Sequence, residues 1–124
     1  MKCTPLPISS WKMVRAGKFL LILAQTPCQK TMGLQNVESL PYNTLMLFTD
    51  VGPRALFHTR NCKFPLEIIS IDKNLRILAI WTAPVGLDKV GITPARTVNV
   101  LEAPIGWAAG QKLKVGDQLL FLKT

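Results

Sequence analysis

The fold of this chain is decided by the stretch Leu66-Glu67-Ile68-Ile69-Ser70-Ile71-Asp72-Lys73-Asn74-Leu75-Arg76-Ile77-Leu78-Ala79-Ile80-Trp81-Thr82. It consists of two apolar runs, typical of strands, on either side of a short polar segment. Aspartate and asparagine tolerate left-handed backbone conformations, so that the polar segment suits the tight loop of a β-hairpin. We therefore predict two strands, over 66–71 and 75–82, that pair with each other.

Short strand patterns recur on both sides of this hairpin. We predict further extended segments at 11–14, 18–24, 45–48, 54–58, 96–102 and 118–122, and short helices at 28–32 and 106–113. The first helix has a cap threonine, an N-terminal proline and a terminating glycine in Thr26, Pro27 and Gly33. Because no βαβ rhythm is present, the pattern predicts a mainly β fold, a small antiparallel, barrel-like sheet with two short helices.

The length of the chain limits it to one domain. With 124 residues and 13.7 kDa it can bury a core without a metal or a disulfide. We expect residues 1–17 to form an extended N-terminal arm and the first strand, and residues 18–124 to form a single β-rich domain. A hydrophobic fraction of 48% is high for a free domain of this size, which predicts a partner over some of the apolar surface.

The charge of the chain is positive and unevenly distributed. There are 15 Lys and Arg against 7 Asp and Glu, and the first acidic residue is Glu38. Such a field favours an acidic protein surface, a nucleic acid or an anionic membrane, although it also serves solubility alone. The candidate docking surface consists of Trp11, Lys12, Arg15 and Lys18. Because there is no basic recognition helix, we rank nucleic acid below a protein assembly or a second copy of the chain as the partner.

The cysteines and the N-terminal segment bear on the compartment. Cys3, Cys28 and Cys62 form no CxxC pair and leave an odd thiol, which we interpret as a sign of a reducing compartment. One histidine and three scattered cysteines predict neither a metal site nor a cofactor. Prolines interrupt the first seven residues, and 19–24 is too short to span a bilayer. We expect the protein in the cytoplasm or in a virion.

A polar run precedes the 66–82 hairpin. Phe57-His58-Thr59-Arg60-Asn61-Cys62 contains the only histidine of the chain. Polar groups held in a small core must find partners, so such a cluster is either a structural lock or a site. The candidate polar cluster consists of Phe57, His58, Arg60, Asn61, Glu67 and Glu102.

A family resemblance runs from about Phe19 to Phe121. It rests on the order of Gly33-Leu34, Met46-Leu47-Phe48, Phe57 with Asn61 ahead of Pro65-Leu66-Glu67-Ile68, Ile71-Asp72, Val100-Leu101-Glu102, Gly106 and Gly116-Asp117. In this order the chain resembles the prokaryotic domain of unknown function 192 family. The resemblance implies a small β-rich, barrel-like fold with two short helices and no established activity. Family members typically show Phe-Trp-Met-Lys-Asn-Thr at 57–62, so His58 and Thr59 replace Trp and Met.

Three functions from different classes remain open. The first, which we expect, is a non-enzymatic structural or interaction protein that docks on a larger assembly, such as a decoration, cement, tail or neck protein of a phage particle. The second is a small-ligand binding module with Phe57, Trp81 and Trp107 as pocket walls. Its polar contacts would come from His58, Arg60 and Asn61.

The third function is an enzyme. Cys62 could act as a thiolate with His58 as its base, since Arg60 and Lys63 would lower the pKa of the thiol. Alternatively, Glu67 and Glu102 could be paired carboxylates for acid and base catalysis. We expect no catalytic residues, because neither set is complete. Buried Asn61, Glu67 and Glu102 would instead satisfy backbone N–H groups of loops.

Overall fold

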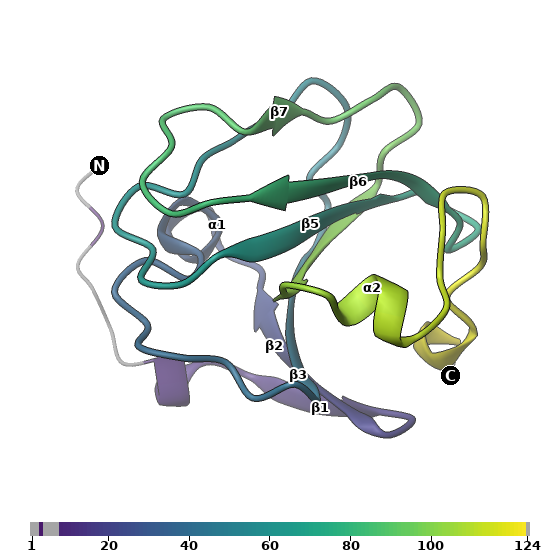
Figure 1. Ribbon diagram of the computed structural model, residues 1–124, viewed down its shortest axis with the longest axis horizontal. Coiled ribbons are helices and arrows are strands. Elements are labelled where there is room, and N and C mark those ends of the chain that lie inside the picture. The colour runs from purple at the N-terminus through teal and green to yellow at the C-terminus, as the bar shows by residue number, and fades with distance from the viewer. Residues whose placement is uncertain (1–2, 4–7, 124) are drawn as a thin grey trace.

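A computed structural model describes Cys3 and residues 8–123 of the chain. Its centre is a six-stranded sheet in the order β1-β2-β3-β8-β5-β6 (Figure 1). The bounds are Met13–Ala16 for β1, Phe19–Ala24 for β2, Thr44–Phe48 for β3, Leu66–Ile71 for β5, Ile77–Ala83 for β6 and Asn99–Pro104 for β8. A second, two-stranded sheet pairs β4 (Leu56–Phe57) with β7 (Gly91–Ile92). The helices are α1 (Pro27–Met32) and α2 (Trp107–Gly110), and 3-10 turns lie at η1 (Ile8–Ser10) and η2 (Leu120–Leu122).

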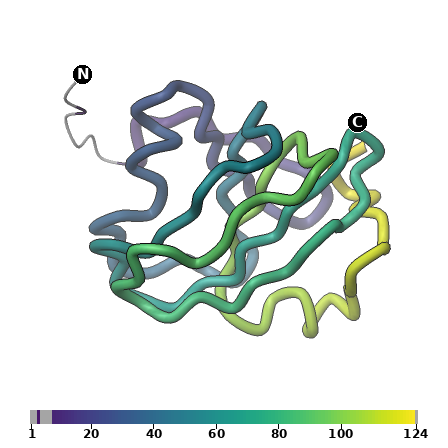
Figure 2. The backbone as a smooth tube through the Cα atoms, turned by 90° about the horizontal axis from the view of Figure 1, so that it is seen from above, coloured from purple at the N-terminus to yellow at the C-terminus, as the bar shows by residue number. Residues whose placement is uncertain are grey.

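The prediction of a mainly β fold with two short helices is confirmed. The term barrel-like holds only loosely, because the large sheet is twisted but not closed, and β1 and β6 are its two edges (Figure 2). One neighbouring pair, β2 and β3, is parallel, and the other pairs are antiparallel. Parallel strands need a connection that crosses a face of the sheet, and here α1 with the segment after it makes that crossing.

The β5–β6 hairpin forms where the sequence predicts it. Leu66 pairs with Ala83 and Ile71 with Ile77, with a register shift between Ser70 and Ile71. In the turn, the Asp72 carboxylate accepts hydrogen bonds from the backbone N–H groups of Asn74 (2.8 Å) and Arg76 (3.0 Å). This Asx-type capping explains why a short polar segment reverses the chain here.

The start of α1 also follows from local chemistry. The Thr26 side chain accepts a hydrogen bond from the backbone N–H of Gln29, and the Gln29 side chain accepts one from the backbone N–H of Thr26. This reciprocal capping box, with Pro27 at the first position of the helix, fixes where α1 begins.

Three predicted elements differ from the structure. Residues 118–122 form no strand but an isolated bridge between Gln118 and Arg76, followed by η2, because the segment meets the β5–β6 hairpin only at its tip. The loop 83–94 contains β7, whose two residues are too few to leave a strand pattern. The extended arm falls largely outside the described residues, and Ile8–Ser10, which the structure does describe, is a 3-10 turn closed by a bond from Trp11 N–H to the Ile8 carbonyl (3.0 Å).

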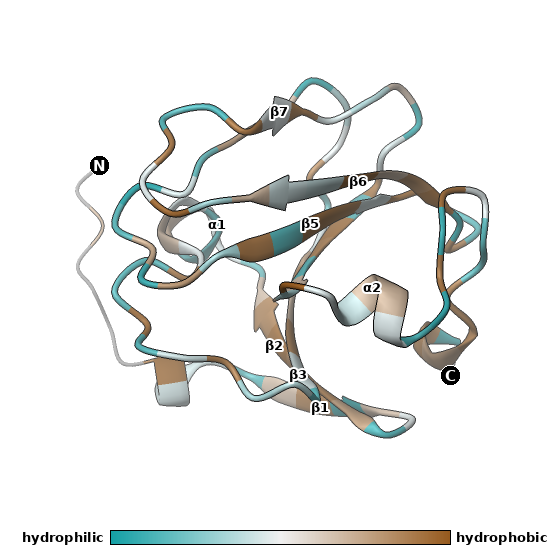
Figure 3. Cartoon of the chain, in the orientation of Figure 1, coloured by the Kyte–Doolittle hydropathy of each residue, from teal (hydrophilic) through white to brown (hydrophobic). Residues whose placement is uncertain are grey.

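The large sheet carries a separate apolar core on each face, since alternate residues of a strand point to opposite sides. We call them the α2-face core and the α1-face core. Figure 3 shows the apolar strands that supply both cores. The α2-face core contains, among others, Phe19, Leu21, Leu45, Ile69, Leu101, Ala103 and Trp107. The α1-face core contains, among others, Ile22, Leu34, Met46, Phe48, Leu66, Ile68 and Val100.

Two of the three cysteines form a disulfide bond. Cys3 and Cys28 are joined by a disulfide, and Cys62 is a free thiol. Cys62 is thus the odd thiol. Disulfides persist mainly in oxidising compartments, whereas we interpreted the odd thiol as a sign of a reducing one, so the compartment stays a prediction. Among residues 3 and 8–123, no helix is long and apolar enough to cross a membrane.

Candidate functional site

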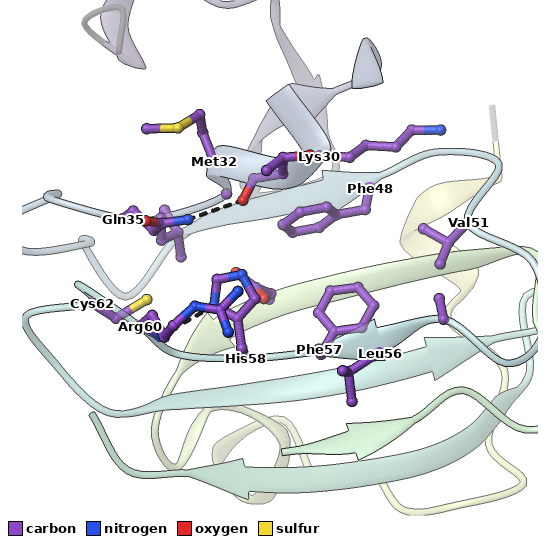
Figure 4. A pocket seen from close by; sticks show the side chains of 15 residues that line it. Lys30, Met32, Gln35, Phe48, Val51, Leu56, Phe57, His58, Arg60 and Cys62 are labelled. Carbon is purple, nitrogen blue, oxygen red and sulfur yellow. Dashed lines mark hydrogen bonds between the residues drawn. The ribbon is translucent and has the colours of Figure 1, made fainter. Parts of the chain in front are cut away.

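A pocket of about 380 Å³ opens on the α1 face of the large sheet. Its walls come from the end of α1 and the residues after it, from the end of β3, and from β4 with the turn that follows (Figure 4). The lining residues are Lys30, Thr31, Met32, Gly33, Leu34, Gln35, Phe48, Val51, Ala55, Leu56, Phe57, His58, Arg60, Cys62 and Glu102. Phe48, Val51, Leu56 and Phe57 gather at one end, and Gln35, His58, Arg60 and Cys62 gather at the other (Figure 4).

The apolar end is built on two aromatic rings. Phe48 and Phe57 meet edge to face, with ring centroids 5.4 Å apart and an interplanar angle of 79°. Such pairs hold both rings in place more firmly than burial alone. The pocket therefore has one rigid, apolar wall.

Glu102 lines this pocket from a central strand of the sheet. It pairs with Met46 of β3 on one side and with Ile68 of β5 on the other, so both of its neighbours on this face are apolar. The residue is 3% exposed. Within the described part of the chain, no group donates a hydrogen bond to its carboxyl. Burial alone raises the pKa of this carboxyl to about 8, so the neutral acid predominates at pH 7.

Gly33 leaves the space beside this carboxyl. Its backbone has a φ of +48°, in the left-handed region that glycine tolerates, and it ends α1. A Cβ at this position would lie 3.2 Å from the Phe48 ring and 3.9 Å from Glu102 Oε1. Any larger residue would thus enter the pocket next to the acid.

His58 and Arg60 stand at the polar end of the pocket. The backbone N–H of Arg60 donates to His58 Nδ1 (3.2 Å), so the neutral ring carries its proton on Nε2. Burial, and then the Arg60 charge, lower the pKa of His58 against an opposing effect of Asp88. The Arg60 guanidinium lies 3.7 Å from the Asp88 carboxylate, but both side chains are more than half exposed, so the pair is weak.

Cys62 does not have the properties of an activated thiol. Burial, and then the Glu102 carboxyl, raise the pKa of the thiol to about 11. The prediction that Arg60 and Lys63 would lower this pKa is therefore wrong. Lys63 instead pairs with Glu38 on the surface, with 2.7 Å between Nζ and Oε1.

Two residues of the polar run hold the turn rather than line the pocket. The Asn61 amide donates to Gln35 Oε1 (3.1 Å), and the Asn61 carbonyl accepts from the backbone N–H of Asn36 (2.8 Å). Thr59 is fully buried; its hydroxyl donates to the Pro84 carbonyl (2.7 Å) and accepts from the backbone N–H of Leu87 (2.9 Å). The turn is thus tied both to the segment after α1 and to the loop after β6.

Glu67 lies on the opposite face of the sheet from Glu102. It pairs with Ala103, whereas Glu102 pairs with Ile68, and successive residues of a strand point to opposite sides. Its two carboxylate oxygens accept from the backbone N–H groups of Gly106 (3.0 Å) and Ala108 (2.8 Å). The expectation that a buried glutamate satisfies loop N–H groups is confirmed for Glu67. The structure does not bring the two carboxylates together, so the predicted pair is wrong.

The other two predicted pocket walls also lie elsewhere. Trp107 is fully buried in the α2-face core, where its ring meets Phe19 with centroids 5.4 Å apart. Trp81 packs against Gly91, where a Cβ would come within 2.7 Å of its Nε1. Sequence reasoning missed Lys30, Gly33, Gln35 and Phe48 as pocket residues. Gly33 and Phe48 belong to the matched family order, which was the one signal available for them.

The candidate docking surface is divided in the structure. Trp11 is 7% exposed and belongs to the α1-face core, so it offers little surface to a partner. Lys12, Arg15 and Lys18 are exposed around the edge strand β1 and its turn. Lys18 Nζ lies 5.5 Å from the centre of the Phe19 ring.

Comparison with known proteins gives a family and a fold. No curated protein is similar enough to the chain to count as a relative. A solved protein of unknown function from Novosphingobium aromaticivorans DSM 12444 is 28% identical, with a TM-score of 0.78 over 93% of this chain and 89% of that one. A solved protein from Sinorhizobium meliloti 1021, titled a "putative transcription regulator", has a TM-score of 0.75 at 22% identity, over 81% of this chain and 79% of that one, and supports the fold alone. The model of the DUF192 family, described as "Uncharacterized ACR", matches residues 12–121, and the chain belongs to this family.

Proposed function

We propose that this protein is a non-enzymatic binding module that holds a small organic ligand in the pocket over Glu102. The observation that carries the proposal is the Glu102 carboxyl itself, which is buried in the pocket wall without a hydrogen-bond partner among the described residues. In the described part of the chain, the buried side-chain atoms without a partner are the indole nitrogens of Trp11 and Trp107, not the Glu102 oxygens. The Glu102 carboxyl therefore reaches the open space of the pocket, where a ligand with a matching polar group can form a hydrogen bond to it.

The same geometry argues against catalysis. A cysteine nucleophile needs a lowered pKa or a base beside it, whereas the pKa of Cys62 is raised to about 11. His58 Nδ1 already accepts a hydrogen bond from the Arg60 backbone. The second buried carboxylate, Glu67, is engaged on the other face of the sheet. None of these groups is arranged as a nucleophile with a base.

A thermal-shift screen with a metabolite library tests the proposal. A compound that binds the native state raises the melting temperature, and a pocket binder should also slow alkylation of Cys62, which lines the pocket. The shift should shrink in Glu102→Leu and persist in Glu38→Gln, a control whose carboxylate lies on the surface. A screen in which no compound both raises the melting temperature and protects Cys62 would count against the proposal.

Docking on a larger assembly, such as a phage particle, remains a second proposal. It is supported by the apolar side chains of Leu56 and Ile92, which are paired across the small sheet and are 53% and 49% exposed. In a co-sedimentation assay with phage particles, Ile92→Ser should reduce binding. Val115→Ser, which removes a similarly exposed side chain (57%) away from the small sheet, should not. Equal binding by both variants, or no sedimentation of the wild type, contradicts docking through this surface.

A further inference from the structure

The chemistry of the pocket narrows the ligand class, on the assumption that the proposed binding function holds. The pocket has a basic rim, a wall of aromatic and aliphatic side chains, and one buried acid. Its basic groups, Lys30 and Arg60, are not matched by an acid that lines the pocket in ionised form. Asp88, the partner of Arg60, is 86% exposed and does not line the pocket.

We propose that the pocket binds a small organic carboxylate with an apolar or aromatic body, and that Glu102 forms a hydrogen bond to that ligand. The body of the ligand packs against Phe48 and Phe57 at the apolar end (Figure 4). The carboxylate lies at the polar end, where Arg60 supplies positive charge and His58 Nε2 a further donor.

The protonation state of Glu102 is consistent with this assignment. A neutral carboxylic acid donates a hydrogen bond, and an ionised carboxylate only accepts. Its neighbours across the sheet, Met46 and Ile68, carry no charge, and the pKa of Glu102 is raised by burial with no opposing effect of Lys30 or Arg60. The acid therefore presents a donor to an incoming anion instead of repelling it.

The other titratable groups that line the pocket add no negative charge near pH 7 that would repel an anionic ligand. Cys62, from the turn after β4, is a neutral thiol with a pKa of about 11. Burial and Arg60 lower the pKa of His58, which is therefore neutral near pH 7. Lys30, from α1, directs its ammonium toward the Asp50 carbonyl, at 3.3 Å. The groups that favour an anion are therefore Arg60 and the Nε2–H donor of His58, which lie together at the polar end of the pocket (Figure 4).

A matched series of three probes tests the ligand class. Phenylacetate, 2-phenylethanol and 2-phenylethylamine share the same ring and differ in charge. By calorimetry near neutral pH, phenylacetate should bind about tenfold more tightly than either of the others, which corresponds to about 1.4 kcal/mol. Its affinity should fall about tenfold between about pH 7 and about pH 9, because Glu102 must keep its proton and has a pKa of about 8.

Two variants separate the roles of the acid and the cation. Glu102→Gln should weaken phenylacetate binding by a few-fold, because an amide is a weaker donor, and should remove the fall with pH. Arg60→Gln should weaken phenylacetate binding several-fold and leave 2-phenylethanol unaffected. Glu38→Gln and Arg15→Gln make the same chemical changes on the surface, away from the pocket, and should behave as wild type.

The other possible results distinguish an error in the ligand class from an error in the binding function. If the amine or the alcohol binds best and protects Cys62 from alkylation, the ligand class is wrong while the binding function stands. The ligand class is also wrong if phenylacetate binds with the same affinity at all pH values, since Glu102 would then not donate. If none of the three probes binds at concentrations up to about 10 mM, where even affinities near −3 kcal/mol are detectable, the inference is overturned. The metabolite screen then decides the binding function separately.

Discussion

The two faces of the large sheet treat a buried glutamate in opposite ways. Glu67 and Glu102 lie on neighbouring strands, one register position apart, and both are less than a tenth exposed. On the α2 face, Glu67 accepts hydrogen bonds from two backbone N–H groups at the start of α2 and so fixes that helix to the sheet. On the α1 face, Glu102 has no partner in the described part of the chain and borders a pocket. Burial alone therefore does not distinguish an acid that stabilises the fold from an acid that is a candidate for binding. The hydrogen-bond partners of the acid make that distinction.

The two faces also differ in whether the buried carboxyl has hydrogen-bond partners within the described part of the chain. The Glu67 side stabilises the fold, because each carboxylate oxygen meets a donor that would otherwise be unpaired. The Glu102 side holds an acid that is neutral near pH 7 and that costs stability when it is ionised.

The largest expected effect is on the pH dependence of stability. Burial raises the pKa of Glu102 from its ordinary value of 4.5 to about 8, so the folded state holds the proton more tightly than the unfolded state. The stabilising effect of the proton is complete below about pH 4.5 and is lost as the pH rises to about 8, by about 1.4 kcal/mol per pH unit. Urea unfolding across this range should give a curve for wild type that falls relative to that of Glu102→Gln. Parallel curves would mean that Glu102 is not a buried, unpartnered acid.

The same substitution at both glutamates should have opposite effects. Glu67→Leu leaves the N–H groups of Gly106 and Ala108 without an acceptor and should lower the free energy of unfolding by about 2–3 kcal/mol. Glu102→Leu removes an unpartnered acid between apolar neighbours and should raise it by about 1 kcal/mol at neutral pH. Chemical denaturation of both variants at one pH provides the measurement. If both lose stability equally, the two faces do not differ as described.

Cys62 can report on the Glu102 face alone. The pKa of Cys62 is raised from its ordinary value of 9.0 to about 11, which leaves about a hundredfold less thiolate near pH 8 than an exposed cysteine has. Alkylation by iodoacetamide, followed by mass spectrometry, should be correspondingly slow. Glu102→Gln should accelerate it several-fold, since the Glu102 charge is the second cause of the raised pKa. Glu67→Gln, on the far face, should leave the rate unchanged, and an equal acceleration by both would refute the assignment.

The smallest effect should come from the rim of the pocket. Asp88→Asn removes the exposed ion pair with Arg60 and should change stability by less than about 0.5 kcal/mol. It should lower the pKa of His58 further, because Asp88 opposes the effects of burial and of Arg60. An NMR titration of the His58 ring measures the shift. A rise in the pKa would mean that Asp88 does not act on His58 as an anion.

Local sequence was enough for the elements that local chemistry defines. The β5–β6 hairpin, the capping box of α1 and the apolar strand β3 all follow from residues within a few positions of one another. The family resemblance also singled out both Glu67 and Glu102. What it could not give was the face on which each lies, because that depends on the pairing of β5 (66–71) with β8 (99–104), which are distant in the chain.

The pocket was harder to predict than the sheet. Its lining includes the segment after α1 and the turn after β4, which are joined through Asn61 and Gln35, and no local pattern reports that contact. Thr59 looked like a gap in the family motif, yet its hydroxyl ties the turn to the loop after β6. Trp81 and Trp107 were expected in the pocket wall because of their residue type, and tertiary packing placed them elsewhere.

The one parallel pair of strands has a consequence for how this family can diversify. Because β3 runs parallel to β2, the chain must cross the sheet between them, and residues 25–43 make that crossing. Residues 30–35 of this connection line the pocket, with Gly33 beside the Glu102 carboxyl. Only the two ends of the connection are constrained by the ladder. A longer or shorter connection should therefore change the shape of the pocket, while every strand pairing of the sheet stays in register.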